Sequence, residues 1–227
     1  MITLYQTKPS TMKTKTFTYI FAAISILEII SGTIGFREGV FLTKPLIMLS
    51  IIAFYYSQVQ KTIKKQDILM LIAFTFSWLG DVFLMLSGEI YFMLGLGSFL
   101  MTHLFYIYVF NRNKEKANWS ARIFIPILSI SVFSLIYNHV EKGLLIPVLV
   151  YMLAISTMAI TASERKTNVG SFRFVFVGAM LFVISDSFLA IEKFAYKIPA
   201  STILVMSTYV LAQYFIATGF LKQSLKA

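Results

Sequence analysis

Long apolar runs separated by short polar connections dominate this chain. The sequence is 58% hydrophobic and only 13% charged, whereas soluble domains carry about 25% charged residues. Backbone groups surrounded by lipid must form hydrogen bonds within helices, and about 20 apolar residues suffice to cross a bilayer. We therefore predict an all-α polytopic membrane protein, a single bundle of eight transmembrane helices at 17–36, 45–60, 68–87, 91–110, 121–137, 144–162, 172–192 and 200–221.

Basic residues are distributed unevenly between the two sides of such a bundle. If the N-terminal tail, residues 1–16, is cytoplasmic, most Lys and Arg residues fall on the cytoplasmic side. The positive-inside rule then predicts that the C-terminal tail, residues 222–227, is cytoplasmic too, with one membrane domain at 17–221 between the tails. The basic residues left on the outer side are Arg37, Lys44, Lys142, Lys193 and Lys197.

The net charge of +10 does not indicate a nucleic-acid partner. Its basic residues form short clusters between apolar runs, which is typical of loops beside anionic membrane lipid. The sequence contains no Cys and two His, without a zinc-binding spacing. A thiolate nucleophile is therefore excluded, and neither a metal nor an organic cofactor is predicted. The expected partners are lipids of the membrane.

Two acidic residues lie inside apolar runs in similar surroundings. Asp81 in GDVFL and Asp186 in SDSFL each follow a small residue, six residues before the predicted outer end of their helix. Ionisable residues at membrane depth are costly and usually functional. Two carboxylates in one cavity repel each other, so one holds a proton and the pair provides an acid and a base. The alternative is structural: each carboxylate bridges neighbouring helices or pairs with Lys44.

Other polar residues could line the same cavity. Lys44 precedes Pro45, which suits the first turn of a helix. Lys44 could bind a phosphate or hold an Asp ionised, or it could simply end the helix as a snorkelling lysine. Glu28 is a third wall of the cavity or a hydrogen-bonding partner of a neighbouring helix. Ser185 could bind a carboxylate, and Gly80 permits close approach of helices.

Three further residues lie deeper along the predicted helices. His103 is near mid-membrane, where a single His more often bonds across helices than binds a metal. Tyr209 and Gln213 are four residues apart and so share a helix face. They are predicted to form hydrogen bonds between helices, with a position near the two acids as the alternative.

At these residues the chain resembles the YhhN-like integral membrane proteins, which include the animal lysoplasmalogenases. The similarity covers nearly the whole predicted membrane domain, with its motifs in the same order. The matching elements are Lys44-Pro45-Leu46, Phe76-Ser77 with Gly80-Asp81, Gly97 with Phe99, His103 and Tyr106, Ser185-Asp186 with Ala190 and Phe194, and Thr208-Tyr209 with Gln213 and Gly219.

The resemblance implies an intramembrane hydrolase that cleaves the vinyl-ether bond of lysoplasmalogen. The products would be a fatty aldehyde and glycerophosphoethanolamine or glycerophosphocholine, formed without a cofactor. It implies that Asp81 and Asp186 are catalytic. We expect the protein in a bacterial cytoplasmic membrane. A carrier or proton-coupled transporter that uses the same acids, or a lipid-binding membrane protein, is the alternative. The substrate-binding candidates are Lys44, Glu28, Ser77, His103, Ser185, Tyr209 and Gln213.

Overall fold

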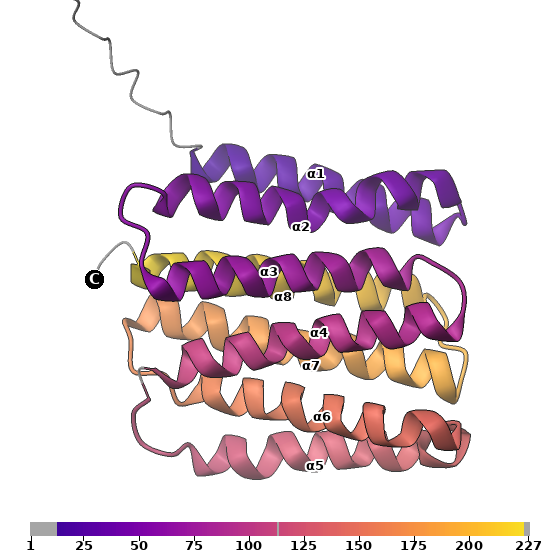
Figure 1. The fold of residues 1–227 in the computed structure, drawn as a ribbon. Helices are drawn as coiled ribbons and strands as arrows, with labels where there is room; N and C mark the ends of the chain where they lie inside the picture. The colour runs from indigo at the N-terminus through magenta and orange to yellow at the C-terminus, as the bar shows by residue number, and fades with distance from the viewer. Residues whose placement is uncertain (1–12, 113, 225–227) are drawn as a thin grey trace, which may run out of the picture.

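The computed structural model describes residues 13–112 and 114–224, and its long elements are all helices (Figure 1). Eight helices are long and apolar enough to cross a membrane, which confirms the predicted fold class. The tail residues 1–12 and 225–227 lie outside the described residues. The helices are α1 (Thr14–Thr33), α2 (Arg37–Val59), α3 (Lys65–Leu84), α4 (Glu89–Asn111), α5 (Trp119–Ile136), α6 (Lys142–Ser163), α7 (Val169–Phe194) and α8 (Ser201–Ser224).

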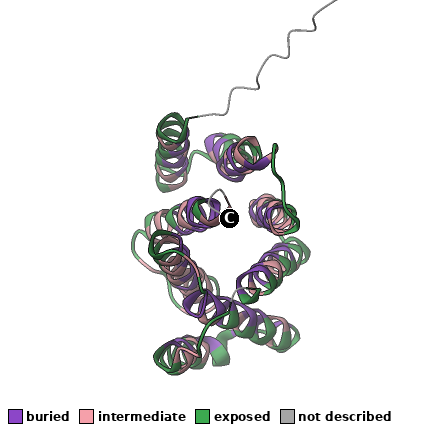
Figure 2. Cartoon of the chain, turned by 90° about the vertical axis from the view of Figure 1, so that its left-hand side faces the viewer, coloured by how far each residue is buried: buried purple, intermediate pink, exposed green. Residues whose placement is uncertain are grey.

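Helices α2, α3, α4, α6, α7 and α8 form a closed ring in which each contacts the next. Helix α1 packs outside the ring against α2 and α8, and α5 packs outside it against α6 and α7. Figure 2 shows this arrangement along the helix axes. We call the end of the bundle with the connections 60–64 and 164–168 the terminal end, because α1 begins there and α8 ends there; the opposite end is the distal end (Figure 1).

Several helices begin at residues whose side chains satisfy backbone N–H groups. The Asn118 side chain accepts a hydrogen bond from Ala121 N, and that of Asn168 accepts one from Ser171 N. Asp67 Oδ2 accepts from Lys64 N at 3.0 Å. Such caps stabilise a helix start by about 1 kcal/mol. They explain why helices resume after short polar connections.

Helix α2 begins at Arg37, eight residues before the predicted start at residue 45. The prediction was wrong because it treated Pro45 as a first-turn residue, and Pro45 lies inside the helix. Proline removes one N–H group, a loss that membrane helices tolerate where neighbouring groups compensate. Lys44 is therefore two turns inside α2 rather than at its start.

Glycines allow the closest helix contacts. A Cβ atom at Gly178 of α7 would lie 2.8 Å from the Ala212 carbonyl oxygen of α8. A Cβ atom at Gly80 of α3 would lie 2.6 Å from the Phe99 ring of α4. Both distances are shorter than van der Waals contact, so larger side chains would push the helices apart. The predicted role of Gly80 in close helix approach is confirmed.

Polar contacts join the connections at the terminal end. Glu164, which directly follows α6, accepts hydrogen bonds from Arg122 Nε at 2.6 Å and Asn118 N at 3.1 Å. Its other carboxylate oxygen lies 3.1 Å from Lys114 Nζ. These donors, led by Arg122, lower the pKa of Glu164 to about 2. The ionised carboxylate thus ties the 112–118 connection and α5 to the end of α6.

Candidate functional site

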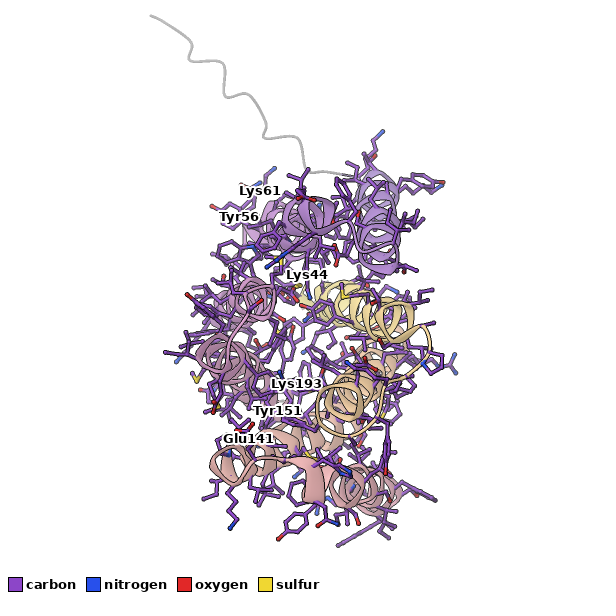
Figure 3. All side chains as sticks on the ribbon, turned by 90° about the vertical axis from the view of Figure 1, so that its right-hand side faces the viewer. Lys44, Tyr56, Lys61, Glu141, Tyr151 and Lys193 are labelled. Carbon is purple, nitrogen blue, oxygen red and sulfur yellow. The ribbon has the colours of Figure 1, made fainter. Side chains whose placement is uncertain are left out.

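A cavity of about 410 Å³ lies inside the ring near the distal end. Both intramembrane acids line it, Asp81 from α3 and Asp186 from α7. Lys44, Ser185, Lys193 and Tyr209 also line this space, which we call the acidic cavity. Figure 3 looks into the bundle from the distal end and shows Lys44 and Lys193 directed toward its centre.

The two acids are not at equal distances from their helix ends. Helix α3 ends at Leu84, three residues after Asp81, whereas α7 ends at Phe194, eight residues after Asp186. The expected spacing of six residues from each acid to the end of its helix is therefore wrong. The carboxylates nevertheless reach one cavity, because the connection 85–88 continues its wall beyond the end of α3.

Asp81 receives a directed chain of hydrogen bonds. Tyr209 OH donates to Asp81 Oδ2 at 2.6 Å, and the Ser77 hydroxyl lies 3.3 Å from Tyr209 OH. Gln213 Nε2 donates to Ser77 Oγ at 2.6 Å, and Tyr106 OH donates to Gln213 Oε1 at 3.0 Å. All five side chains are buried. The oxygen atoms of Tyr209, Ser77 and Gln213 each accept a hydrogen bond from the next residue of the chain. The hydroxyl proton of Tyr209 is therefore directed toward the Asp81 carboxylate.

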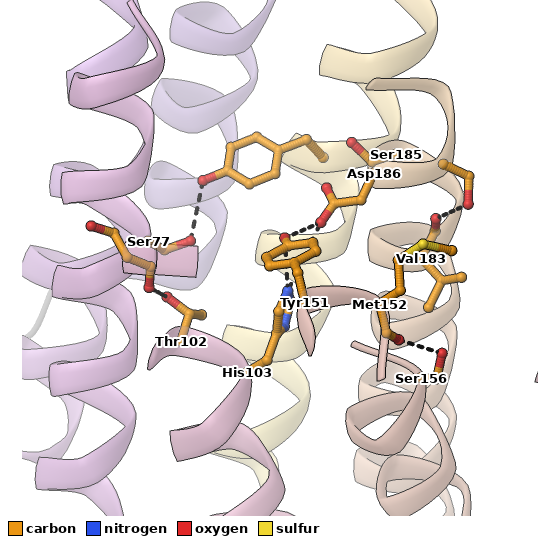
Figure 4. Close-up of polar contacts among 12 residues, drawn as sticks. Ser77, Thr102, His103, Tyr151, Met152, Ser156, Val183, Ser185 and Asp186 are labelled. Carbon is orange, nitrogen blue, oxygen red and sulfur yellow. Dashed lines mark hydrogen bonds and ion pairs between the residues drawn. The ribbon is translucent and has the colours of Figure 1, made fainter. Parts of the chain in front are cut away.

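Asp186 has a shorter chain behind it. Tyr151 OH of α6 donates a short hydrogen bond to Asp186 Oδ2, and His103 Nε2 of α4 lies 3.0 Å from the same hydroxyl (Figure 4). The hydroxyl proton lies toward Asp186, so His103 Nε2–H is the donor to Tyr151. His103 Nδ1 is buried without a hydrogen-bond partner among the described residues. His103 of α4 thus bonds to Tyr151 of α6, in agreement with the predicted bond across helices.

The remaining candidates are arranged as follows. Lys44 lines the acidic cavity together with Asp81 and Asp186. Glu28 is buried on α1 and accepts a hydrogen bond from Thr43 Oγ1 at 2.6 Å. Ser185 donates to the Val205 carbonyl oxygen at 3.0 Å and so binds α8 rather than a carboxylate. Tyr209 and Gln213 form interhelical bonds, as predicted.

Sequence reasoning missed Tyr151 and Lys193. Lys193 was counted only as an outer basic residue, yet it lies seven residues after Asp186. Two helical turns separate such residues, so they share a helix face. That spacing was a signal that could have identified Lys193. Tyr151 lies among apolar neighbours in the sequence and offered no comparable signal.

An apolar slot of about 60 Å³ adjoins the acidic cavity. Asp186 and Lys193 line both spaces, whereas Asp81 lines only the cavity. Together the two spaces provide carboxylates, cations and a narrow apolar passage. The slot is formed mainly by α4, α5, α6 and α7, through Phe99, Val132, Tyr151, Met152, Ile155 and Val183.

The arrangement suits acid–base chemistry on a lipid. A protonated carboxyl group can donate to a substrate atom while an ionised one accepts a proton from water. The tyrosine hydroxyls orient the carboxylates, and the lysines supply positive charge for an anionic group. Within 13–112 and 114–224, no three His, Cys, Asp or Glu side chains come together as ligands for a metal ion.

The fold and the cavity define an integral, multi-pass membrane protein with two carboxylates in one cavity, Asp81 buried and Asp186 partly exposed. A model of the YhhN family matches residues 40–220, so the chain belongs to the YhhN family. This span contains both acids and every lining residue named above for the cavity and the slot.

Relatives with assigned names come from animals and from bacteria. The chain is 31% identical to "Lysoplasmalogenase TMEM86A" of Bos taurus over 151 residues, 64% of this chain and 62% of that protein. It is 27% identical to "Lysoplasmalogenase TMEM86B" of Rattus norvegicus over 150 residues, 66% and 60% of the two chains. It is 29% identical to "Lysoplasmalogenase" of Mycobacterium tuberculosis over 135 residues, 57% and 51%. The matches thus span less than two thirds of each relative. No solved structure matches the chain.

Proposed function

We propose that this protein is an intramembrane lipid hydrolase that cleaves the vinyl-ether bond of lysoplasmalogens. The observation that carries the proposal is the pair of carboxylates from α3 and α7 in one cavity, each with a tyrosine donor, beside an apolar slot. The names of the relatives support the same reaction. The products are a fatty aldehyde and glycerophosphoethanolamine or glycerophosphocholine.

The reaction needs one proton donor and one proton acceptor. A carboxyl group protonates the β-carbon of the vinyl ether, and the α-carbon becomes an oxygen-stabilised cation. Water adds to the α-carbon as the second carboxylate removes its proton. The hemiacetal then breaks its bond to the glycerol oxygen, which takes up the hydroxyl proton as the aldehyde forms. The proton that the second carboxylate took from water then returns to the first, through water in the cavity, which restores the starting state. One water molecule is consumed, and Asp81 and Asp186 suffice as acid and base, as in two-carboxylate glycosidases.

Aldehyde release by the purified protein in detergent tests this proposal. The substrates are an alkenyl-lysophosphatidylethanolamine and the corresponding ester lysolipid, which cannot release an aldehyde on hydrolysis. We expect aldehyde only from the alkenyl lipid, and a loss of roughly 10²–10⁴-fold in both Asp81→Asn and Asp186→Asn. Glu38→Gln, at an exposed acid of α2, is the matched control. Absence of aldehyde from folded wild type would refute the reaction and favour a carrier.

We further propose that the protein lies in a bacterial cytoplasmic membrane with its terminal end in the cytoplasm. The distribution of Lys and Arg supports this orientation. Since the chain has no Cys, a single cysteine introduced by substitution reports on which side of the membrane its position lies. In bacterial cells, Ser87→Cys should react with a membrane-impermeant maleimide, and Thr62→Cys only after lysis. The reverse pattern of labelling would show that the terminal end lies outside the cytoplasm.

A further inference from the structure

Lys193 lies where three spaces meet. It lines the acidic cavity, the apolar slot and a third hollow of about 310 Å³ at the distal end. Its ammonium group is 5.0 Å from the centre of the Phe92 ring. It forms no ion pair with any described residue, whereas Lys197 nearby pairs with Glu192 at 3.3 Å. Lys193 thus lies at the junction of polar and apolar spaces with no carboxylate at ion-pair distance among the described residues, although Asp81, Asp186, Glu89 and Glu141 line the same spaces.

Lys44, the other cation of the acidic cavity, is placed differently. It lines the cavity together with Asp81 and Asp186, and like Lys193 it forms no ion pair with a described residue. Lys44 does not line the apolar slot. Of the two lysines that line the acidic cavity, Lys193 is therefore the one that also borders the apolar slot.

We propose that Lys193 binds the phosphate of a single-chain phospholipid whose hydrocarbon chain begins in the apolar slot. The inference rests on the proposed function and deepens it. The slot is apolar, its volume of about 60 Å³ admits only the first carbons of one chain, and both Asp186 and Lys193 line it. A lysine ammonium is a common phosphate ligand in proteins.

The spacing along α7 fits this placement. Asp186 and Lys193 are seven residues apart, a rise of roughly 10 Å along the helix. In the substrate, seven bonds connect the β-carbon of the vinyl ether to the phosphorus atom. An extended chain advances about 3.5 Å for every three bonds, so these seven bonds span roughly 8 Å. The flexible lysine side chain covers the difference.

This orientation assigns the roles of the two acids. The β-carbon is on the chain side of the vinyl ether and the α-carbon on the headgroup side. Asp186 borders both slot and cavity, so it is the carboxyl group that protonates the β-carbon. Asp81 borders only the cavity, so it removes the proton from the water that adds to the α-carbon.

Binding of a saturated analogue tests the subsite without any turnover. A 1-O-alkyl-lysophosphatidylethanolamine has no vinyl ether and cannot be hydrolysed by this reaction. A 1-O-alkylglycerol of equal chain length lacks the phosphate. The full-length protein in detergent, as wild type, Lys193→Gln, Lys44→Gln and Lys197→Gln, is titrated with each lipid and with inorganic phosphate. Lys197, on the same end of the bundle, is the matched control.

We expect wild type to prefer the phospholipid, and Lys193→Gln to weaken its binding by roughly tenfold or more, the effect of one charge-assisted hydrogen bond. Binding of the alkylglycerol should not change, and Lys197→Gln should behave as wild type. Equal binding of the two lipids by wild type, or a loss confined to Lys44→Gln, would overturn the proposal. Inorganic phosphate that competes as well as the phospholipid would show a free-anion site instead.

The outcome is separable from that of the proposed reaction. If the phospholipid binds through Lys193 but no aldehyde forms from the alkenyl lipid, the subsite stands and the reaction is refuted. If aldehyde forms while Lys193→Gln binds the analogue like wild type, the reaction stands and this orientation is refuted.

Discussion

The two halves of the chain pair their helices in the same order but place their acids in different surroundings. Helix α1 packs on α2 and α3 on α4, just as α5 packs on α6 and α7 on α8. The third helix of each half carries an intramembrane Asp. Asp81, however, receives its tyrosine from α8, whereas Asp186 receives its tyrosine from α6. These two helices do not correspond to each other, because α8 is the fourth helix of its half whereas α6 is the second.

This difference separates a fixed carboxylate from an accessible one. Asp81 is 2% exposed, at the end of four successive hydrogen bonds. The Asp186 side chain is 15% exposed and borders the apolar slot. Similar sequence patterns thus provide two acids, and the neighbouring helices determine which of them a lipid can approach.

The largest effect is expected from the acids themselves. Asp186→Asn should lower kcat/KM more than Asp81→Asn, because an oxygen-stabilised cation still reacts with water without a base. We expect losses toward the upper and lower ends of roughly 10²–10⁴-fold, respectively. Aldehyde release at saturating and at limiting substrate concentrations measures kcat and kcat/KM for each variant. A larger loss in Asp81→Asn would show that Asp81 is the acid and Asp186 the base. Equal losses would show that the two acids do not differ in the way proposed here.

The tyrosines should separate activity from stability. Tyr151→Phe removes the donor to the accessible Asp186, and we expect kcat/KM to fall roughly tenfold or more. Tyr209→Phe breaks the buried chain and leaves Ser77 without that partner, so unfolding should become easier by about 1–3 kcal/mol. Thermal unfolding and aldehyde release, measured on both variants, compare the two effects. A larger loss of stability in Tyr151→Phe than in Tyr209→Phe would contradict the proposed difference.

The apolar slot should control chain length. Val132 of α5 is 9% exposed and lines the slot, so Val132→Phe should shorten the longest chain that binds. Each methylene excluded from apolar surroundings weakens binding roughly fourfold. Ile130→Phe on the same helix is the control, because Ile130 is 66% exposed. Titration with alkyl-lysolipids of increasing length measures the shift. An equal shift in both variants would place the chain elsewhere.

The sequence predicted the fold well and the site in part, for reasons that particular residues show. Hydrophobic runs determine where helices lie, and the cost of burying Asp81 and Asp186 marked them as unusual. The start of α2 was missed because Pro45 can occupy the first turn or the interior of a helix. Tyr151 was missed because the bond to Asp186 depends on the rotation of α6 and α7, which sequence spacing within one helix does not determine.

The smallest effect on activity is expected at the terminal end, away from the acidic cavity, where Asp67 in the first turn of α3 and Glu164 after α6 differ in the charge of their partners. Asp67 accepts a hydrogen bond from the neutral hydroxyl of Tyr55 at 2.7 Å, whereas Glu164 bonds to Arg122 and pairs with Lys114.

Because the pKa of folded Glu164 is lowered from 4.5 to about 2, its contribution to stability is present above about pH 4.5 and is lost as the pH falls toward 2. At pH 7, Glu164→Gln should lower the free energy of unfolding by about 2 kcal/mol. Thermal unfolding of wild type and variant across this pH range should show the difference shrinking with acidity. A difference that stays constant down to pH 3 would show that neutral hydrogen bonds, rather than the ion pair, hold this connection, as they do at Asp67.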